Sequence, residues 1–477
     1  MNIILVSRRS TKELWKHEFF RDFLKEHIPG ISVQIVCGET NPGEWIVKPD
    51  VSYLYEDYES FLIQSQDLSD LEIARLQSLQ AHIAPSPLYK SSRAYQLKQK
   101  SDRELALRMI YIIDKTQKII QKINPQFVFM TGGAELVQTA FFCTAQYLNI
   151  PSYRILDVTH LNPNCKGSRY WFCSNNYCRL SPTEENQFGY DQASVMSHAK
   201  DLVFSISSNQ YKLDNYARNT SRFLWVGFKS IKAGLIQKTL VSLKHLKKEL
   251  EYQLKPREVF SAQYTPLENA ILNRRLATNP LDLPKPFFLF PLNIPMDAQI
   301  ILRSPQWKDG LSVCEQVSNV LPYNYSLVVK EHPGYPGMIE HYRLKSFLRS
   351  HPNVFYLEGD VRLWDILPDS AALITVNSTS ALEALAQNIP VVTLGEAFYR
   401  GSGLTYDVAS PLDLQTTLTE VIADPKQENR NQLLLETIAK LLQETVPSPG
   451  QVISSEEDQY LNIIAEGMVS KIRRKGL

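Results

Sequence analysis

The chain has 477 residues, of which 44% are hydrophobic and 21% are charged. This length suits two domains, because single hydrophobic cores stop growing at about 250–300 residues, and the composition is that of a globular protein. The 51 Lys and Arg residues balance 50 Asp and Glu residues, which leaves a formal net charge of +1. Without a basic excess the chain has no field that would attract nucleic acid, so we expect no nucleic-acid partner.

Cysteine spacing and hydropathy favour a protein of the cytoplasm. The six cysteines form no pair or Cys/His cluster with the spacing of a zinc site, which fits reduced thiols. The apolar run over residues 3–6 is too short for the core of a signal peptide, and no stretch reaches the roughly 18 apolar residues of a membrane span. We therefore expect a cytoplasmic protein whose only contact with a membrane is peripheral, at its inner face.

Strands and helices alternate along the first half of the chain. The predicted strands are residues 3–6, 32–37, the apolar run before Gly132-Gly133, and 150–156, and the predicted helices are 12–26, 71–81, 102–123 and 134–148. Strand, glycine turn and helix in this order are typical of a doubly wound sheet. Residues 1–260 are therefore predicted to form a Rossmann-like N-terminal domain.

Two segments of this half lack such a pattern. Residues 160–180 carry Lys166, Arg169 and several aromatic residues without any periodicity, which predicts a long surface loop. Residues 229–255 predict a lysine-rich helix. Its basic residues form either a solvated helix face or a patch that rests on anionic lipid.

The second half predicts another parallel sheet. Strands are expected at 287–290, 326–330, 354–357, 372–376 and 391–394, with helices at 312–320 and 379–387. We assign residues 261–430 to a C-terminal domain and residues 431–477 to a helical tail. The helix of this tail is predicted to begin at the capping-box pattern of residues 454–457. The fold class is thus α/β, with two doubly wound parallel-sheet domains.

The strongest candidate for a binding loop follows the strand 326–330. Lys330, Glu331 and His332 place a cation, a carboxylate and an imidazole where ligands bind to open α/β sheets, at the carboxyl edge. Pro333 disfavours the helical region for the residue before it and so holds the imidazole out of the strand. The alternative is a His-Pro turn without a function.

A second loop contains Asn377, Ser378 and Thr379 and leads into a helix. The free amide groups of a helix start, its positive dipole end and two hydroxyls suit a phosphate without a metal. The alternative is an ordinary N-cap, since Ser and Thr are common at that position. Glu383 lies one turn into the helix. Its carboxylate either accepts hydrogen bonds from ribose hydroxyls or is simply stabilised by the positive end of the helix dipole.

Two further loops complete the expected edge. Gly395 opens a loop whose glycines let the backbone approach a ligand and whose Tyr399 and Arg400 are candidates for donor contacts. Asp297 lies in the turn that leaves the strand 287–290. We expect four loops, from four strands, to meet at one ligand.

The segments LVVKEHPG, VNSTSALEAL and PVVTLGEAFYRGSGLT, together with the turn at residues 297–300, resemble the capsule polysaccharide synthesis family. This family includes the Kdo transferases of bacterial capsule linkers and is similar to bacterial sialyltransferases. The resemblance implies a GT-B arrangement of two Rossmann-like domains facing a cleft and a CMP-activated acid sugar as donor. It also implies that His332 and the Ser378-Thr379 pair hold the nucleotide phosphate. The chain departs from the family pattern at Asn293, where glutamine is usual, and at Glu331, where proline is common.

The expected chemistry needs no metal or other cofactor. The Asp-x-Asp spacing that grips Mg²⁺ or Mn²⁺ in other glycosyltransferases does not occur, and a protonated His332 with helix amides can stabilise the departing phosphate. A base or nucleophile is expected from the N-terminal domain. Glu135 is the first candidate, although a helix dipole would favour the same carboxylate, and Asp157 is the alternative.

The sequence thus predicts a metal-independent glycosyltransferase that moves a sugar from a nucleotide-sugar donor to a polysaccharide or glycolipid acceptor. Two rivals stay open because a fold does not fix a reaction. One is a nucleotide-sugar epimerase that acts on a UDP-sugar. The other is a non-catalytic scaffold of polysaccharide export.

Overall fold

The protein is described by a computed structural model. The residues with a described structure are 1–7, 11–38, 51–55, 57–83, 101–131, 136–158, 169–175, 178–180, 188–208, 266–294, 297, 300, 303–423, 429–448 and 457–475. The lysine-rich segment 229–255 and Glu135 lie outside them, as does the domain boundary predicted at residue 260.

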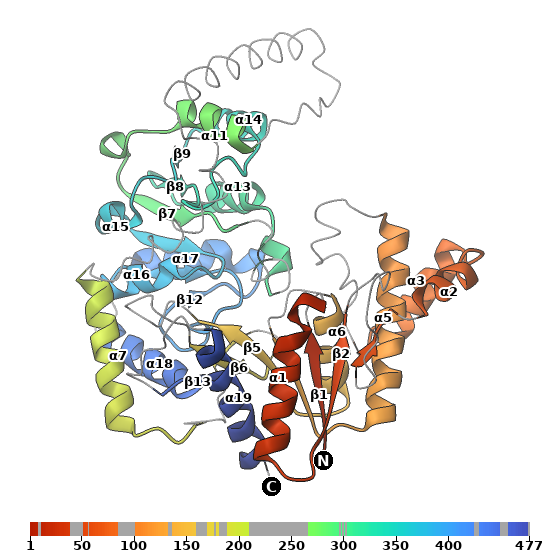
Figure 1. Ribbon diagram of the computed structural model, residues 1–477. Coiled ribbons are helices and arrows are strands. Elements are labelled where there is room, and N and C mark those ends of the chain that lie inside the picture. The colour runs from red at the N-terminus through yellow and green to blue at the C-terminus, as the bar shows by residue number, and fades with distance from the viewer. Residues whose placement is uncertain are drawn as a thin grey trace, which may run out of the picture. The chain divides into compact units, whose positions relative to one another are not determined.

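The chain divides into two compact units. The first comprises Met1–Leu202, Ile301–Pro305 and Leu435–Leu477, and the second comprises Val203–Ile300 and Gln306–Leu434. Each unit is built on one sheet with helices, and most strand pairs are parallel, which confirms the predicted α/β class (Figure 1). Residues 435–477, which the sequence analysis assigns to a separate tail, supply a strand and a helix to the first unit.

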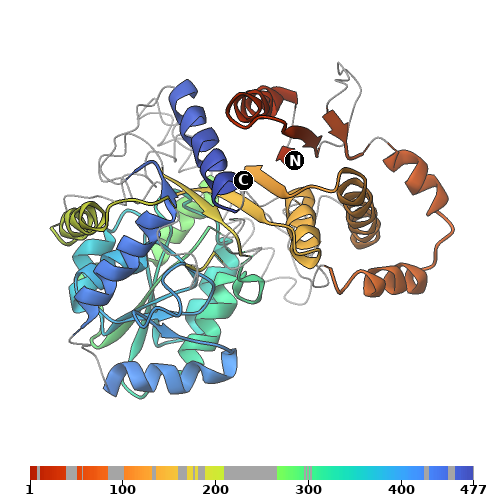
Figure 2. The ribbon, with the colours of Figure 1, turned by 90° about the horizontal axis from the view of Figure 1, so that it is seen from below.

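The first sheet has the strand order β13-β6-β5-β4-β1-β2-β3. Its parallel strands are β1 (Asn2–Ser7), β2 (Ser32–Cys37), β3 (Val51–Tyr53), β4 (Phe127–Thr131) and β5 (Ser152–Asp157). On one face, side chains of β1 and β4 pack with α1 (Thr11–His27) and α19 (Glu457–Arg474). On the other face they pack with α5 (Asp102–Ile123) and α6 (Leu136–Tyr147), as Figure 2 shows from below. The continuous apolar run of residues 3–6 in β1 follows from these two covered faces.

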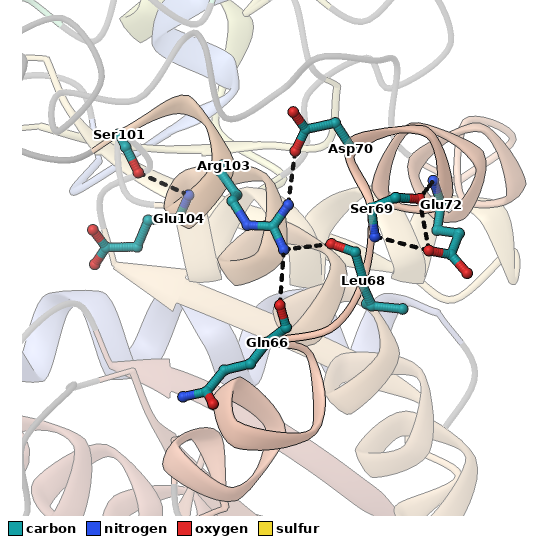
Figure 3. A network of polar contacts seen from close by, with 8 residues as sticks. All are labelled: Gln66, Leu68, Ser69, Asp70, Glu72, Ser101, Arg103 and Glu104. Carbon is teal, nitrogen blue, oxygen red and sulfur yellow. Dashed lines mark hydrogen bonds and ion pairs between the residues drawn. The ribbon is translucent and has the colours of Figure 1, made fainter.

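The helices α2 (Tyr58–Gln64) and α3 (Asp70–Leu79) are fastened to α5 by one arginine (Figure 3). The Arg103 guanidinium donates to the carbonyls of Gln66 and Leu68 and pairs with Asp70 at 2.7 Å. Ser69 and Glu72 close a capping box at the start of α3. The turn between α2 and α3 is therefore held by the Arg103 hydrogen bonds and by the capping box at the start of α3.

The segment 170–173 corrects a prediction, because it is a buried strand and not part of a surface loop. β6 (Tyr170–Cys173) pairs antiparallel with β5 on one side and with β13 (Thr445–Val446) on the other. Both of its faces are covered, so its side chains show none of the polar alternation by which a half-buried strand is recognised. The indole of Trp171 donates to the buried Glu444 carboxylate at 2.8 Å.

The second sheet is parallel throughout, with the order β12-β11-β10-β7-β8-β9. The strands are β7 (Phe287–Pro291), β8 (Ser326–Lys330), β9 (Val354–Leu357), β10 (Ala372–Thr375), β11 (Val391–Thr393) and β12 (Tyr406–Asp407). The helices of this unit include α11 (Pro266–Asn273), α13 (Gly310–Val320), α14 (His341–Ser350), α15 (Leu363–Ile366), α16 (Ser380–Ala386) and α17 (Leu414–Ala423). The predicted strands of this half are confirmed to within one residue at each end.

The helices α7 (Gln192–Ser207) and α18 (Arg430–Gln443) each contain a boundary between the two units. No helix in the described ranges combines the length and the apolar character that a membrane span requires.

We expect the β6–β13 pairing to be required for the stability of the first unit. Trp171→Phe removes the donor to the buried Glu444 carboxylate and should lower the free energy of unfolding by about 1–3 kcal/mol. Trp15→Phe is the matched control, because Trp15 is 41% exposed on α1 and should change stability by less than about 0.5 kcal/mol. Urea unfolding of both variants measures the difference, and equal losses would contradict this role of Trp171.

Candidate functional site

The order of strands in the second sheet defines where its ligand site lies. The chain runs from β7 through β8 to β9 on one side and then returns as β10 on the other side of β7. Ligands of open α/β sheets bind at such a switch point, outside the carboxyl ends of the strands. The loops after β7, β8 and β10 are therefore the ones expected to form the site.

Two asparagines meet at this switch point. Asn293 follows β7 and Asn377 follows β10, and the Asn293 side-chain amide donates to Oδ1 of Asn377 at 3.3 Å. Oδ1 of Asn293 is buried and has no hydrogen-bond partner among the described residues. A buried acceptor without a partner is costly, and this one lies where a ligand is expected. Asn293 was noted in the sequence only as a departure from the family pattern.

The loop after β8 is held by its lysine. Lys330 is 2% exposed, and its ammonium donates to the carbonyls of Glu331 at 3.3 Å and Gly359 at 3.1 Å. The loop after β9 approaches so closely that a Cβ on Gly359 would lie 3.0 Å from Cα of Pro333. In this structure Lys330 thus joins two loops. Its predicted contact with the nucleotide-sugar donor stays a prediction.

His332 has a defined protonation state. Its Nδ1 accepts a hydrogen bond from the Gly334 amide at 3.1 Å, which leaves the proton of the neutral ring on Nε2. Burial, and then the Lys330 charge, lower the pKa of His332 to about 4. The ring is therefore neutral near pH 7, in contrast to the protonated His332 expected from the sequence. It can offer a phosphate a hydrogen-bond donor, with no positive charge.

Glu331 turns away from the site that its neighbour His332 is expected to serve. Its carboxylate accepts from the Gly337 amide at 2.7 Å and is largely buried. Burial raises the pKa of Glu331, and the Gly337 amide partly opposes that rise. The Glu331 charge also helps to raise the pKa of the buried Tyr356 hydroxyl, after the larger effect of burial. The Glu331 carboxylate thus binds a backbone amide inside the second unit.

The two hydroxyl side chains in the loop after β10 differ in their hydrogen bonds. The Ser378 amide donates to Oγ1 of Thr375, and the Ser378 hydroxyl accepts from the Ser380 amide at 3.2 Å. Thr379 is the N-cap residue of α16, yet its side chain makes no capping hydrogen bond. Ser378 therefore has a local structural role, as the alternative interpretation of this loop requires, whereas Thr379 does not. Glu383 is buried within α16.

The loop after β11 is braced by the two side chains that were candidates for donor contacts. The Tyr399 hydroxyl donates to the Ser378 carbonyl at 2.9 Å. Arg400 donates to the carbonyls of Thr393, Gly395 and Val408. Both side chains donate hydrogen bonds to backbone carbonyls in this structure. A contact of either side chain with the nucleotide-sugar donor stays a prediction. Asp297 caps a turn after β7, where the Ile300 amide donates to its carbonyl.

One of the two predicted bases, Asp157, has a described position. Asp157 is the last residue of β5 and its side chain is exposed at the carboxyl edge. Glu135, the first candidate, is outside the described residues. In the described part of the chain, no three His, Cys, Asp or Glu side chains lie close enough together to hold a metal ion.

We predict that His332 makes stability depend on pH below neutrality. Because its folded pKa, about 4, is below the ordinary 6.5, the unfolded chain binds a proton first as pH falls. This contribution is complete above pH 6.5 and is lost toward pH 4, by about 2 kcal/mol on reaching pH 5. His332→Gln removes this titration, so the difference in unfolding free energy between wild type and variant should shrink over that range. Urea unfolding at pH 7.5 and 5 measures it, and a constant difference would contradict a neutral His332.

Part of the chain is similar to a known protein family. Residues 236–437 match the family described as "Capsule polysaccharide biosynthesis protein". Over 127 residues the chain is 33% identical to the capsule polysaccharide modification protein LipB of Neisseria meningitidis, which is 25% of this chain and 30% of LipB. It is 31% identical over 137 residues to protein FixF of Sinorhizobium fredii, covering 28% of this chain and 33% of FixF. The chain thus spans about a third of the length of these curated relatives.

Solved structures are similar over more of the chain at lower identity. The β-Kdo 2,7 transferase of Thermosulfurimonas dismutans KpsC aligns over 99% of both chains with 14% identity and a TM-score of 0.39. The UDP-GlcNAc 2-epimerase of Neisseria meningitidis aligns over 98% of this chain and 100% of its own, with 14% identity and a TM-score of 0.24. The family match and the motifs around His332 and Ser378 fall in the same region of the chain, residues 236–437.

Proposed function

We propose that the protein is a metal-independent glycosyltransferase whose second unit binds a nucleotide-activated sugar at the β7/β10 switch point. The observation that carries this proposal is the set of polar groups on three adjacent strands of a capsule-family region: the Asn293–Asn377 pair and the His332 loop. Following the family resemblance, the donor is a CMP-activated acid sugar such as Kdo or sialic acid.

The proposed site stabilises phosphate with hydrogen bonds from neutral groups. The Nε2 proton of His332 and the Thr379 hydroxyl are donors in the loops after β8 and β10. The unpartnered Oδ1 of Asn293, after β7, accepts a hydrogen bond from a hydroxyl or amino group of the donor nucleotide. Hydrogen bonds to a charged oxygen are about twice as strong as those between neutral groups. Donors held by the fold before the reaction lose little reorganisation energy when charge develops on the departing phosphate.

Buried cations near the site have a positioning role in this proposal. Lys330 fixes the His332 loop against the β9 loop, and Arg400 fixes the loop after β11 against β12. The Lys330 ammonium is bound by backbone carbonyls, and the Arg400 guanidinium is bound by carbonyls and lies 3.8 Å from the Glu396 carboxylate. The Lys330 charge favours an anionic ligand nearby, because a low-dielectric interior weakens screening.

The sugar acceptor, a polysaccharide or glycolipid, is proposed to bind to the first unit. Its hydroxyl requires a base, or a retaining reaction requires a carboxylate nucleophile. Glu135 follows β4 in the sequence, and Asp157 is the last residue of β5, the neighbouring strand of the first sheet. Asp157 is exposed at the carboxyl edge of that sheet.

Binding of CMP tests the donor site. Loss of a hydrogen bond to a charged group costs about 1.5–3 kcal/mol, so His332→Ala and Thr379→Val should each weaken CMP binding by roughly 10- to 150-fold. Calorimetric titration with EDTA present measures the affinity. His351→Ala is the control, because His351 lies at the end of α14, before β9, at the opposite edge of the sheet. Unaltered affinity in His332→Ala would remove His332 from the site, and binding of UDP in place of CMP would favour an epimerase or UDP-sugar transferase.

Ser378→Ala separates capping from binding. Its hydroxyl accepts from the Ser380 amide, so the variant should lose about 0.5–2 kcal/mol of stability. Thr379→Val has no such bond to lose and should keep wild-type stability in thermal melts. A Thr379→Val variant with lower stability and normal CMP affinity would mean that this loop only caps α16.

Turnover with a CMP-sugar identifies the carboxylate. Glu135→Gln should lower kcat by roughly 10²-fold or more while CMP affinity stays near wild type, as expected for loss of a general base. Asp157→Asn, measured in parallel, should retain activity if Glu135 is the base. The reverse pattern would transfer the role to Asp157, and no turnover of any nucleotide-sugar by the wild type would favour a scaffold.

A further inference from the structure

The first sheet has a switch point of its own. The chain passes from β1 through β2 to β3 on one side and returns as β4 on the other side of β1. β1 and β4 are parallel neighbours, with Val6 paired to Met130. By the rule that places ligands in the second sheet, a ligand is expected beyond the ends of β1 and β4, next to Ser7 and Thr131.

The side chains of Ser7 and Thr131 project from the same face. Ile3 and Leu5 of β1 belong to the core beneath α1 and α19, as do Phe127 and Phe129 of β4. Since side chains alternate along a strand, Ser7 and Thr131 follow on that face. Two hydroxyls thus end two adjacent strands on the side that α1 covers.

α1 contributes an imidazole to this pair of hydroxyls. His17 is 3% exposed, and its Nε2 lies 3.3 Å from Oγ1 of Thr131, within hydrogen-bond distance. From the other face, Gln138 of α6 donates its side-chain amide to the Thr131 carbonyl. The end of β4 is therefore held by side chains from both helix layers.

Ser7 supplies the observation that points to a ligand. It is fully buried, and its Oγ has no hydrogen-bond partner among the described residues. Oε1 of Gln138 is also buried and unpartnered. A strand that reads Ile-Ile-Leu-Val before Ser7 would be more stable with an apolar residue there, since buried polar groups without partners destabilise the folded state. Such a hydroxyl is explained if a ligand completes its hydrogen bonds.

We propose that Ser7, His17 and Thr131, here called the β1–β4 cluster, bind a hydroxyl-bearing carbohydrate. All three side chains can both donate and accept hydrogen bonds, which suits the hydroxyls of a sugar. This assignment rests on the proposed function in one respect, which is that the carbohydrate is the sugar acceptor. Its hydroxyls would then lie at the carboxyl edge that also bears Asp157, two strands from β1.

Saturation-transfer NMR on the full-length protein tests the cluster, with the methyl glycosides of Kdo and of glucose as probes. We expect at least one glycoside to bind the wild type and its signal to fall at least fivefold in Ser7→Ala, His17→Gln and Thr131→Val. Thr131→Ser keeps the hydroxyl and should restore binding. Absence of binding by both glycosides to the wild type, or full binding in Thr131→Val, would overturn the proposal.

Matched variants control for general effects. Ser32→Ala changes an exposed serine at the opposite edge of the same sheet, and His27→Gln changes an exposed histidine at the far end of α1. Both should retain glycoside binding. Ser7→Ala should also raise the melting temperature by a few degrees, because it removes an unsatisfied buried hydroxyl. A lower melting temperature in Ser7→Ala would show that Ser7 serves the fold and would overturn its role in binding.

CMP titration of the same variants separates this inference from the proposed function. If both are correct, CMP affinity is unchanged in every variant of the cluster. Glycoside binding by the wild type without any CMP binding would support the cluster and reject the proposed donor. CMP binding without glycoside binding would reject the cluster and leave the proposed donor site standing.

Discussion

A buried ammonium must find hydrogen-bond acceptors inside the protein, and the candidate site of the second unit depends on how Lys330 does so. Its ammonium bonds to carbonyls in the loops after β8 and β9 and so draws these loops together. The two loops approach so closely that a Cβ at residue 359 would lie 3.0 Å from Cα of Pro333. Burial, and to a smaller extent the Lys330 charge, lower the pKa of His332 and keep its ring neutral. The buried Lys330 thus helps to hold the His332 loop and adds to the effect of burial on the imidazole.

The two sheets apply the same topological rule with different chemistry. In each, the chain changes direction beside its first strand, and polar side chains end the two strands at that point. In the second sheet, Asn293 follows β7 and Asn377 follows β10. The neighbouring loops contain cations that donate hydrogen bonds to backbone carbonyls. The first sheet ends in the hydroxyls of Ser7 and Thr131 with His17. The hydroxyls and the imidazole at the first edge are the basis on which a carbohydrate is proposed there.

The family match and the candidate donor site coincide, because both lie in the second unit. The side chains there divide into two groups by their hydrogen bonds. Lys330, Tyr399 and Arg400 bond to backbone carbonyls and hold the loops. Asn293 and Thr379 keep polar atoms without a protein partner or without a capping bond, and these are the groups available to a ligand. Residue type alone does not distinguish the two groups, since a cation is an equally good candidate for either.

The sequence by itself determined the elements of both sheets wherever a strand is long or apolar. The predicted strands 32–37, 326–330 and 354–357 have the observed bounds, because local β-branched and apolar patterns specify them. It also predicted that the loops around His332 and Ser378 follow strands of the same parallel sheet, and they follow β8 and β10. Only the tertiary structure decided that residues 170–173 are a buried strand and that 445–446 pairs with it, since such short segments are specified by distant partners. It likewise decided that His332 is neutral and that His17 reaches Thr131 across 114 positions, because burial and long-range contact have no local signature.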